Sequence, residues 1–231
     1  IMQGKDLLQL AEQFGTPLYV YDAEKIQSQF NRLTKAFSKV EKLRINYAMK
    51  ALSNISILQL LKDMGSGLDT VSIQEVLLGL HAGYAPEKIF YTPNGVSLEE
   101  IEEVNALGVQ INIDNLSILE QFGTKHPNVP VCIRINPHVM AGGNTNISVG
   151  HIDSKFGISI HQLPHLVRIV ENTKMNIVGI HMHTGSDILD IEVFLYAAEI
   201  LFDAARNFKN IEFLDFGSGF KVPYKKDDVQ T

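Results

Sequence analysis

A lysine stands where a buried strand should end, in the stretch INYAMKAL of residues 45–52. The residues before Lys50 are mostly apolar or β-compatible, so the pattern predicts a strand with an amine at its C-terminal end. Other predicted strands also end in polar side chains: Asp69, Asp114, Asn136, His183 and Asp215. Desolvating an amine, an imidazole and carboxylates around one opening is costly unless they have partners. We therefore interpret these side chains as a candidate active site, although Asp114 taken alone is better explained as a helix cap.

A glycine-rich turn, DFGSGF at residues 215–220, follows the last predicted strand. Small residues let backbone amides approach an anion, and the loops after strands seven and eight are the usual phosphate site of a (β/α)₈ barrel. A lysine amine can form an imine with an aldehyde, and an imidazole such as His183 can lie flat against an aromatic ring. Together these features predict pyridoxal 5'-phosphate (PLP) as the cofactor.

Alternation along the strands places the polar side chains on one face. Side chains two residues apart in a strand point the same way. The positions grouped by this rule are Asn46, Ala48 and Lys50; Cys132, Arg134 and Asn136; and Gly179, His181 and His183. The residues between them are mostly apolar, so we expect the polar set to face the interior of a barrel.

The elements that must position these residues alternate strictly. Strands are predicted at residues 42–50, 66–72, 88–93, 109–115, 129–137, 176–183 and 211–219, with helical segments between them. Such alternation favours parallel strands with right-handed crossovers, and repeats of about 20 residues indicate an α/β fold of the (β/α)₈ TIM-barrel type. Seven of eight strands are present, so we expect an incomplete barrel.

Local signals mark where several helices begin. Ser72 and Ser97 each precede a glutamate by three residues, which predicts two capping boxes. Pro164 is predicted in the first turn of a helix and Asp190 at the start of a longer one. An apolar stripe predicts a helix before the first barrel strand, and its members are Ile26, Phe30, Leu33 and Phe37.

The stretch TPLYVYD, residues 16–22, reads as a strand outside the alternation. Without a partner sheet its apolar side chains would be exposed, so we assign it to a second, β-rich domain whose other strands lie in a missing C-terminal part. The expected domains are therefore an N-terminal segment, residues 1–22, and the PLP-binding barrel domain, residues 23–231.

Composition narrows the class of partner. The chain has 231 residues, a formal net charge of −6 and no concentrated basic face, so neither nucleic acid nor an anionic membrane is expected as a partner. No stretch approaches the length of a membrane span, and a secretory signal pattern is absent from the first residues. A single cysteine, Cys132, is most simply a buried apolar residue and favours a reducing compartment. These observations predict a cytoplasmic protein.

The motifs resemble those of fold-type III PLP-dependent decarboxylases, most closely the diaminopimelate decarboxylase branch. The matching stretches occur in the family's order over nearly the whole chain: TPLYVYD, NYAMKAL, GSGLDTVSIQE, RINPH, SKFGI, HMHTGS and DFGSGF. The resemblance implies an alanine racemase-like barrel, a homodimer with a shared active site, a small amino-acid substrate, and the conversion of meso-2,6-diaminopimelate to L-lysine and CO₂.

The resemblance also implies roles for individual residues. Lys50 would form the imine and His183 would stack on the ring, with Asp69 and Arg134 as supporting groups. The phosphate would be held by Ser186, Gly217, Ser218 and Gly219. Two departures from the family's pattern are Ser218, in place of the middle glycine of the phosphate loop, and Asp187, where the family commonly has glutamine. The family's glutamate on strand eight and its partner-subunit cysteine motif lie outside this sequence.

Other interpretations remain open from sequence. The same set of polar residues at the strand ends occurs in ornithine, arginine and carboxynorspermidine decarboxylases, and an alanine racemase uses a comparable lysine. A homologue that binds PLP without turnover would keep Lys50 and the phosphate loop. The pair His181 and His183 could instead bind zinc, although this would leave Lys50 without a role.

Overall fold

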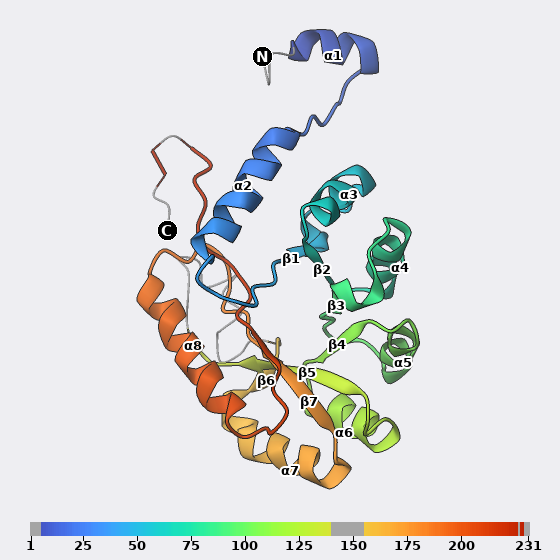
Figure 1. The fold of residues 1–231 in the computed structure, drawn as a ribbon, viewed down its shortest axis with the longest axis vertical. Helices are drawn as coiled ribbons and strands as arrows, with labels where there is room; N and C mark the ends of the chain where they lie inside the picture. The colour runs from blue at the N-terminus through green and yellow to red at the C-terminus, as the bar shows by residue number, and fades with distance from the viewer. Residues whose placement is uncertain (1–5, 140–154, 226, 229–231) are drawn as a thin grey trace.

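The computed structural model describes residues 6–139, 155–225, 227 and 228. A curled sheet of parallel strands runs in the order β1-β2-β3-β4-β5-β7-β8 (Figure 1). The strands are β1 (Asn46–Ala48), β2 (Gly67–Thr70), β3 (Ile89–Tyr91), β4 (Gln110–Ile113), β5 (Pro130–Asn136), β7 (Asn176–His181) and β8 (Phe213–Asp215). A two-residue strand, β6 (Ile158–Ser159), pairs only with β5. The seven predicted strands and their parallel order are confirmed.

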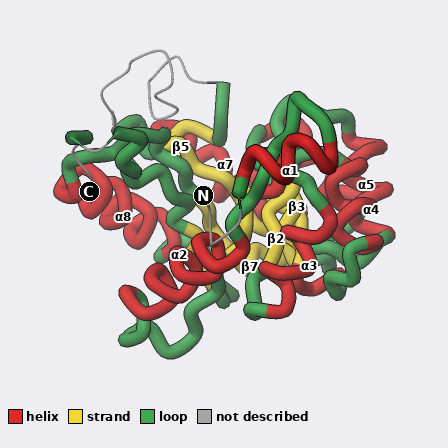
Figure 2. The backbone as a smooth tube through the Cα atoms, turned by 90° about the horizontal axis from the view of Figure 1, so that it is seen from above, coloured by secondary structure: helices red, strands yellow, loops and turns green. Residues whose placement is uncertain are grey.

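Helices cover the outer face of the sheet. The α-helices are α1 (Leu7–Phe14), α2 (Ala23–Ala36), α3 (Ile55–Asp63), α4 (Ile73–His81), α5 (Leu98–Ala106), α6 (Leu116–Lys125), α7 (Leu163–Thr173) and α8 (Ile191–Ala205). The described residues also form short 3₁₀ helices, which are η1 (Met49–Ala51), η2 (Pro86–Lys88) and η4 (Ile160–Gln162). In Figure 1 the helices α3 to α8 surround the arc of strands, and Figure 2 shows the strands gathered inside them. The arrangement is that of a partial (β/α)₈ barrel.

The core between sheet and helices is built from the apolar residues that alternate with the polar set. Ile133 and Ile180 are completely buried there, together with Leu58 of α3 and Leu166 of α7. Fully burying a side chain of this size contributes about 1.5–3 kcal/mol relative to exposure. The burial of the predicted helix-facing residues of β5 and β7 agrees with the predicted alternation along these two strands.

Aromatic rings fill the interior. The rings of Phe90 on β3 and Phe213 on β8 meet edge to face, with centroids 5.6 Å apart. A Cβ atom at Gly179 of β7 would collide with the Phe213 ring. Gly179 is therefore required because a ring from the neighbouring strand occupies the space of its side chain.

The substitution Gly179→Ala is expected to destabilise the protein by about 1–3 kcal/mol, since the added methyl group overpacks the interior. Combining it with Phe213→Leu should recover part of this loss, because the smaller side chain vacates the contested space. Denaturant unfolding of the two single variants and the double variant measures the coupling. Purely additive losses would contradict the overpacking explanation.

The serine caps are confirmed, but the glutamates act differently from a capping box. The Ser72 and Ser97 hydroxyls accept from the amides of Glu75 and Glu100, each at 3.3 Å. The Glu75 carboxylate accepts from the Val71 amide rather than from that of Ser72. Glu100 instead joins two neighbouring elements, because its Oε1 accepts from the Ile73 amide and the Tyr91 hydroxyl. Glu75 therefore keeps a local partner one residue before the expected one, whereas Glu100 bonds to residues outside its own helix.

Other predicted helix starts are also confirmed. Pro164 lies in the first turn of α7, and the Asp190 side chain caps α8 by accepting from the Glu192 amide at 3.0 Å.

The N-terminal segment extends away from the barrel (Figure 1). No residue of α1 or α2 is buried. Residues 16–22 pair with no strand among the described residues, and the side chains of Leu18, Tyr19, Val20 and Tyr21 are exposed, as expected in the absence of a partner sheet. Their assignment to a second domain stays a prediction. No described helix has the length and apolar character needed to cross a membrane.

Candidate active site

Lys50 lies just beyond the C-terminal end of β1, but not in the strand. β1 ends at Ala48, and Met49–Ala51 forms the single turn η1. The predicted alternation through residue 50 is therefore wrong in its last step, because η1 takes over and buries Met49 completely. Lys50 itself is exposed, and its charge acts on Asp69, His181 and His183. Lys50 is therefore close enough to His183 for its charge to lower the pKa of that histidine.

Asp69 of β2 is a carboxyl group with a strongly raised pKa. Burial raises its pKa from 3.8 to about 7, and the charge of Asp215 adds to the effect. The Thr92 hydroxyl donates to Asp69 Oδ1 at 2.5 Å, which opposes the shift together with the charges of Lys50 and Arg134. Sequence reasoning missed Thr92, although it lies two residues after Phe90 and so on the interior face. Asp69 is therefore a proton-holding group near the lysine at neutral pH.

The raised pKa of Asp69 predicts a specific dependence of stability on pH. Because the folded state binds this proton more tightly than the unfolded state, its stabilising effect is full below about pH 4 and is lost as the pH rises through about 7. The difference in unfolding free energy between the cofactor-free wild type and Asp69→Asn should fall by at most about 4 kcal/mol over that window. Denaturant unfolding at a series of pH values measures it. A constant difference would show that Asp69 titrates normally.

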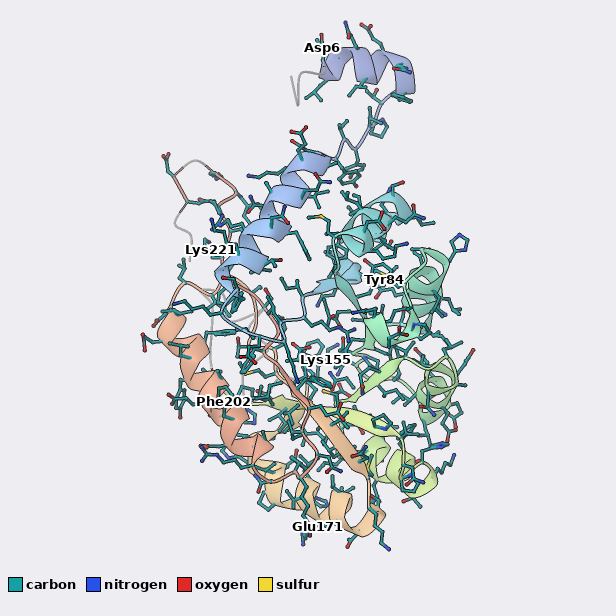
Figure 3. All side chains as sticks on the ribbon, in the orientation of Figure 1. Asp6, Tyr84, Lys155, Glu171, Phe202 and Lys221 are labelled. Carbon is teal, nitrogen blue, oxygen red and sulfur yellow. The ribbon has the colours of Figure 1, made fainter. Side chains whose placement is uncertain are left out.

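Arg134 of β5 is a buried cation inside the mouth. Its guanidinium carbon lies 4.8 Å from the centroid of the Phe156 ring, and the Lys155 ammonium lies 5.1 Å from the same ring. The positive charge of Arg134 acts on two carboxyl groups and two histidines, which are Asp69, Asp215, His181 and His183. Figure 3 shows Lys155 near the middle of the arc of strands. The arginine therefore sets much of the local potential.

His183 lies two residues after β7. Burial lowers its pKa from 6.5 to about 3, and the positive charges of Arg134 and Lys50 act in the same direction. Its Nδ1 lies close to the backbone of the glycine loop, since a Cβ atom at Gly217 would lie 2.9 Å from it. The ring is therefore neutral and adjacent to the glycine turn, which suits stacking on an aromatic cofactor.

The glycine turn after β8 is joined to the loop after β7. The Ile188 amide donates to the Gly219 carbonyl at 2.9 Å, and the Lys221 amide donates to the Ile188 carbonyl at 3.1 Å. The predicted phosphate-binding residues lie in these two loops, with Ser186 in the first and Gly217, Ser218 and Gly219 in the second. Ser186 and Ser218 are both exposed.

The backbone of these loops fits an anion. Gly185, Gly217 and Gly219 all have positive φ angles, and a Cβ atom at Gly219 would collide with the Gly185 carbonyl. The Gly217 amide is already bonded to Asp215 Oδ1 at 2.8 Å. Among the described residues the amides of Ser218 and Gly219 donate to no protein group. A phosphate would therefore be held by these two amides, with Gly217 contributing its backbone shape.

Asp187 adopts a positive φ of 57°. This left-handed conformation is more tolerable for Asp than for most residues. The backbone gives a reason for an Asp at this position, independent of any contact with a ligand.

The remaining polar strand ends have structural partners. The helix-cap explanation of Asp114 is wrong, because Asn115 caps α6 by accepting from the Ile118 amide. Asp114 instead accepts from the Asn94 side chain at 2.5 Å, and Asn94 also donates to the Lys155 carbonyl. Asn136 accepts from the His138 amide. The described residues contain no cluster of three or more metal-ligating side chains, so the pair His181 and His183 has no third ligand there.

Comparison with known protein families shows which family the chain belongs to. Residues 23–231 match the family described as "Pyridoxal-dependent decarboxylase, pyridoxal binding domain". The chain belongs to this family. Within the pyridoxal-dependent decarboxylases, it is 37% identical to a diaminopimelate decarboxylase of Methanothermobacter thermautotrophicus, over 99% of this chain and 55% of the relative. It is 34% identical to the Bacillus subtilis diaminopimelate decarboxylase, over 97% of this chain and 54% of that relative.

Solved structures of this family share the fold. A crystal structure of Helicobacter pylori diaminopimelate decarboxylase complexed with L-lysine superposes with a TM-score of 0.87 at 32% identity, over 96% of this chain and 59% of that one. A lysine/ornithine decarboxylase from Vibrio vulnificus has a TM-score of 0.81 at 22% identity, over 100% of this chain and 61% of that one. This likeness shows a shared fold alone. The chain spans about half the length of the curated relatives it matches. The predicted family, barrel type and PLP cofactor are confirmed.

Proposed function

We propose that this chain is the cofactor-binding part of an enzyme that uses PLP to decarboxylate meso-2,6-diaminopimelate to L-lysine and CO₂, the last step of lysine biosynthesis. The observation that carries the proposal is the juxtaposition of an amine, a neutral imidazole and a glycine turn at one mouth, since the Lys50 charge reaches His183 and His183 Nδ1 adjoins Gly217. The substrate assignment is supported by relatives at 30–37% identity that carry the name diaminopimelate decarboxylase.

Each predicted site residue has a task in this proposal. PLP supplies an aldehyde that binds an amine and a ring that withdraws electrons from the carbon that loses CO₂. Lys50 Nζ would hold the aldehyde, and neutral His183 would lie against the ring. The phosphate would be bound by the Ser218 and Gly219 amides with the Ser186 hydroxyl. Asp69 would hold a proton near neutral pH, and Arg134 would supply fixed positive charge.

The proposal extends to assembly and location. We propose a homodimer whose active site is completed across the subunit interface, located in the cytoplasm, with residues 16–22 joining a second, β-rich domain. The exposed side chains of these residues support the last point. Cys132 is buried and forms no disulfide bond, which agrees with a reducing compartment.

The decisive experiment is borohydride reduction of the full-length protein with PLP, followed by peptide mapping. The expected result is a pyridoxyl group on Lys50, and an adduct confined to another lysine would overturn the proposal. Turnover assays with meso-diaminopimelate, ornithine, arginine and carboxynorspermidine then test the substrate. CO₂ release from diaminopimelate supports the assignment, whereas an adduct on Lys50 without turnover of any of these would identify a PLP carrier.

A further inference from the structure

The imidazole of His181 lies inside the barrel, and the proposed cofactor chemistry gives it no task. His181 is the last residue of β7, two residues before His183, and it is more deeply buried than that histidine. Only 7% of His181 is exposed. Its Nδ1 lies 2.6 Å from Nδ2 of Asn112, a residue of β4 that is 1% exposed.

Charged groups surround this imidazole on several elements. In the sheet register His181 is paired with Arg134 of β5 on one side and Asp215 of β8 on the other. The charges of Arg134 and of Lys50 in η1 act on it, and His181 in turn lowers the pKa of His183. A proton on His181 would therefore add a positive charge next to two cations at the mouth.

Several effects keep the imidazole neutral. Burial lowers the pKa of His181 well below 6.5, and the charges of Arg134 and Lys50 lower it further. The group that faces Nδ1 is an amide, which carries no charge and so does not favour protonation. A carboxylate in the same position would favour the charged imidazolium by direct Coulomb attraction.

The contact also selects one tautomer. With the Asn112 amide nitrogen donating to Nδ1, the proton of the neutral imidazole resides on Nε2. Asn112 Oδ1 is buried and has no hydrogen-bond partner among the described residues. An unsatisfied buried amide oxygen costs stability. Among the described residues, the contact with His181 is the one hydrogen bond made by the Asn112 side chain.

We propose that Asn112 is a positioning residue that holds His181 neutral and in its Nε2–H tautomer below the cofactor site. The charge at the mouth is then set by Lys50, Arg134 and the two carboxyl groups, Asp69 and Asp215. This role rests on the proposed PLP function, because it concerns the electrostatics of that same site.

The test uses ¹⁵N-histidine NMR on the full-length protein, with and without PLP. In the wild type, His181 is expected to keep an unprotonated Nδ1 and a protonated Nε2 throughout the range from about pH 6 to about pH 9. Asn112→Asp should raise the pKa of His181 by about one unit or more, and the PLP absorbance should shift its pH midpoint in the same variant. Asn128→Asp, an equal change of charge on an exposed loop residue, should leave both unchanged.

Titration of wild-type His181 between about pH 6 and pH 9 would overturn the proposal, even if the variant fails to fold. So would an Asn112→Asp protein that matches Asn128→Asp in both readouts. The double variant Asn112→Leu with His181→Leu removes both polar groups without changing the charge and should keep an absorbance midpoint close to that of the wild type; a shift as large as that of Asn112→Asp would overturn the proposal, because it would mean that His181 carries charge in the wild type. Because NMR on the cofactor-free protein reports the imidazole directly, failure of the PLP proposal remains a separate result.

Discussion

Replacing Lys50 with alanine is expected to abolish the pyridoxyl adduct and to lower kcat for diaminopimelate by at least about 10²- to 10⁴-fold. This is the range associated with loss of a positioned proton-transfer group, and the lost covalent attachment adds to it. Lys50 is the lysine whose charge reaches Asp69, His181 and His183 in the part of the chain that the structure describes. Absorbance of bound PLP, mass spectrometry after borohydride reduction and CO₂ release measure the effect.

Two control variants separate chemistry from charge. Lys50→Arg keeps the positive charge but should lose the adduct as completely as the alanine variant, because a guanidinium is a poor nucleophile. Lys88→Ala removes an exposed lysine in η2 and should retain full activity and a normal adduct. Wild-type adduct formation in Lys50→Ala would refute the assignment of the lysine.

The substitution Gly219→Ala is expected to destabilise the loop and to weaken PLP binding by at least about tenfold. Its φ of 123° is unfavourable for any residue with a side chain, and the new methyl group would collide with the Gly185 carbonyl of the adjoining loop. The Gly219 amide is also one of the two proposed phosphate donors. A loss of about 1.4 kcal/mol in binding free energy corresponds to tenfold. Titration of the cofactor-free protein with PLP, followed by fluorescence, measures the dissociation constant.

Gly95→Ala is the matched control for this effect. Gly95 also has a positive φ, of 68°, but a Cβ atom there would meet no other atom within 4 Å. The variant should lose about 1–2 kcal/mol of stability from backbone strain and bind PLP normally. Equal PLP affinities in the two variants would show that the contact between the two loops does not shape the anion site.

Much of this site could be predicted from the alternation of side chains along each strand, in which residues two apart face the same way. Alternation along β5 and β7 predicted the buried positions of Arg134 and His181, whereas His183 lies in the loop after β7; the alternation of strands and helices predicted the parallel order. Serine caps were equally predictable because their partners lie within three residues. Patterns of this kind are local, so one sequence contains all the information they need.

Interactions between distant segments were not predictable in the same way. Thr92 bonds to Asp69 across 23 positions, and Asn94 connects Asp114 to the backbone of Lys155. The turn η1 replaced the end of a predicted strand, and the Glu100 carboxylate left its own helix for Ile73 and Tyr91. Each outcome depends on how side chains and chain turns pack after the strands have paired, and a local sequence pattern does not specify that packing.

The parallel bridge between Ile188 and Phe220 means that the loops after β7 and β8 cannot move independently. Phe220 is further anchored to α8 through the ring of Phe194, at a centroid distance of 4.9 Å. An anion that reduces the motion of one loop must therefore reduce the motion of the other. Slowed hydrogen exchange at the Ile188 and Lys221 amides would then act as a shared reporter of occupancy, readable without substrate or turnover.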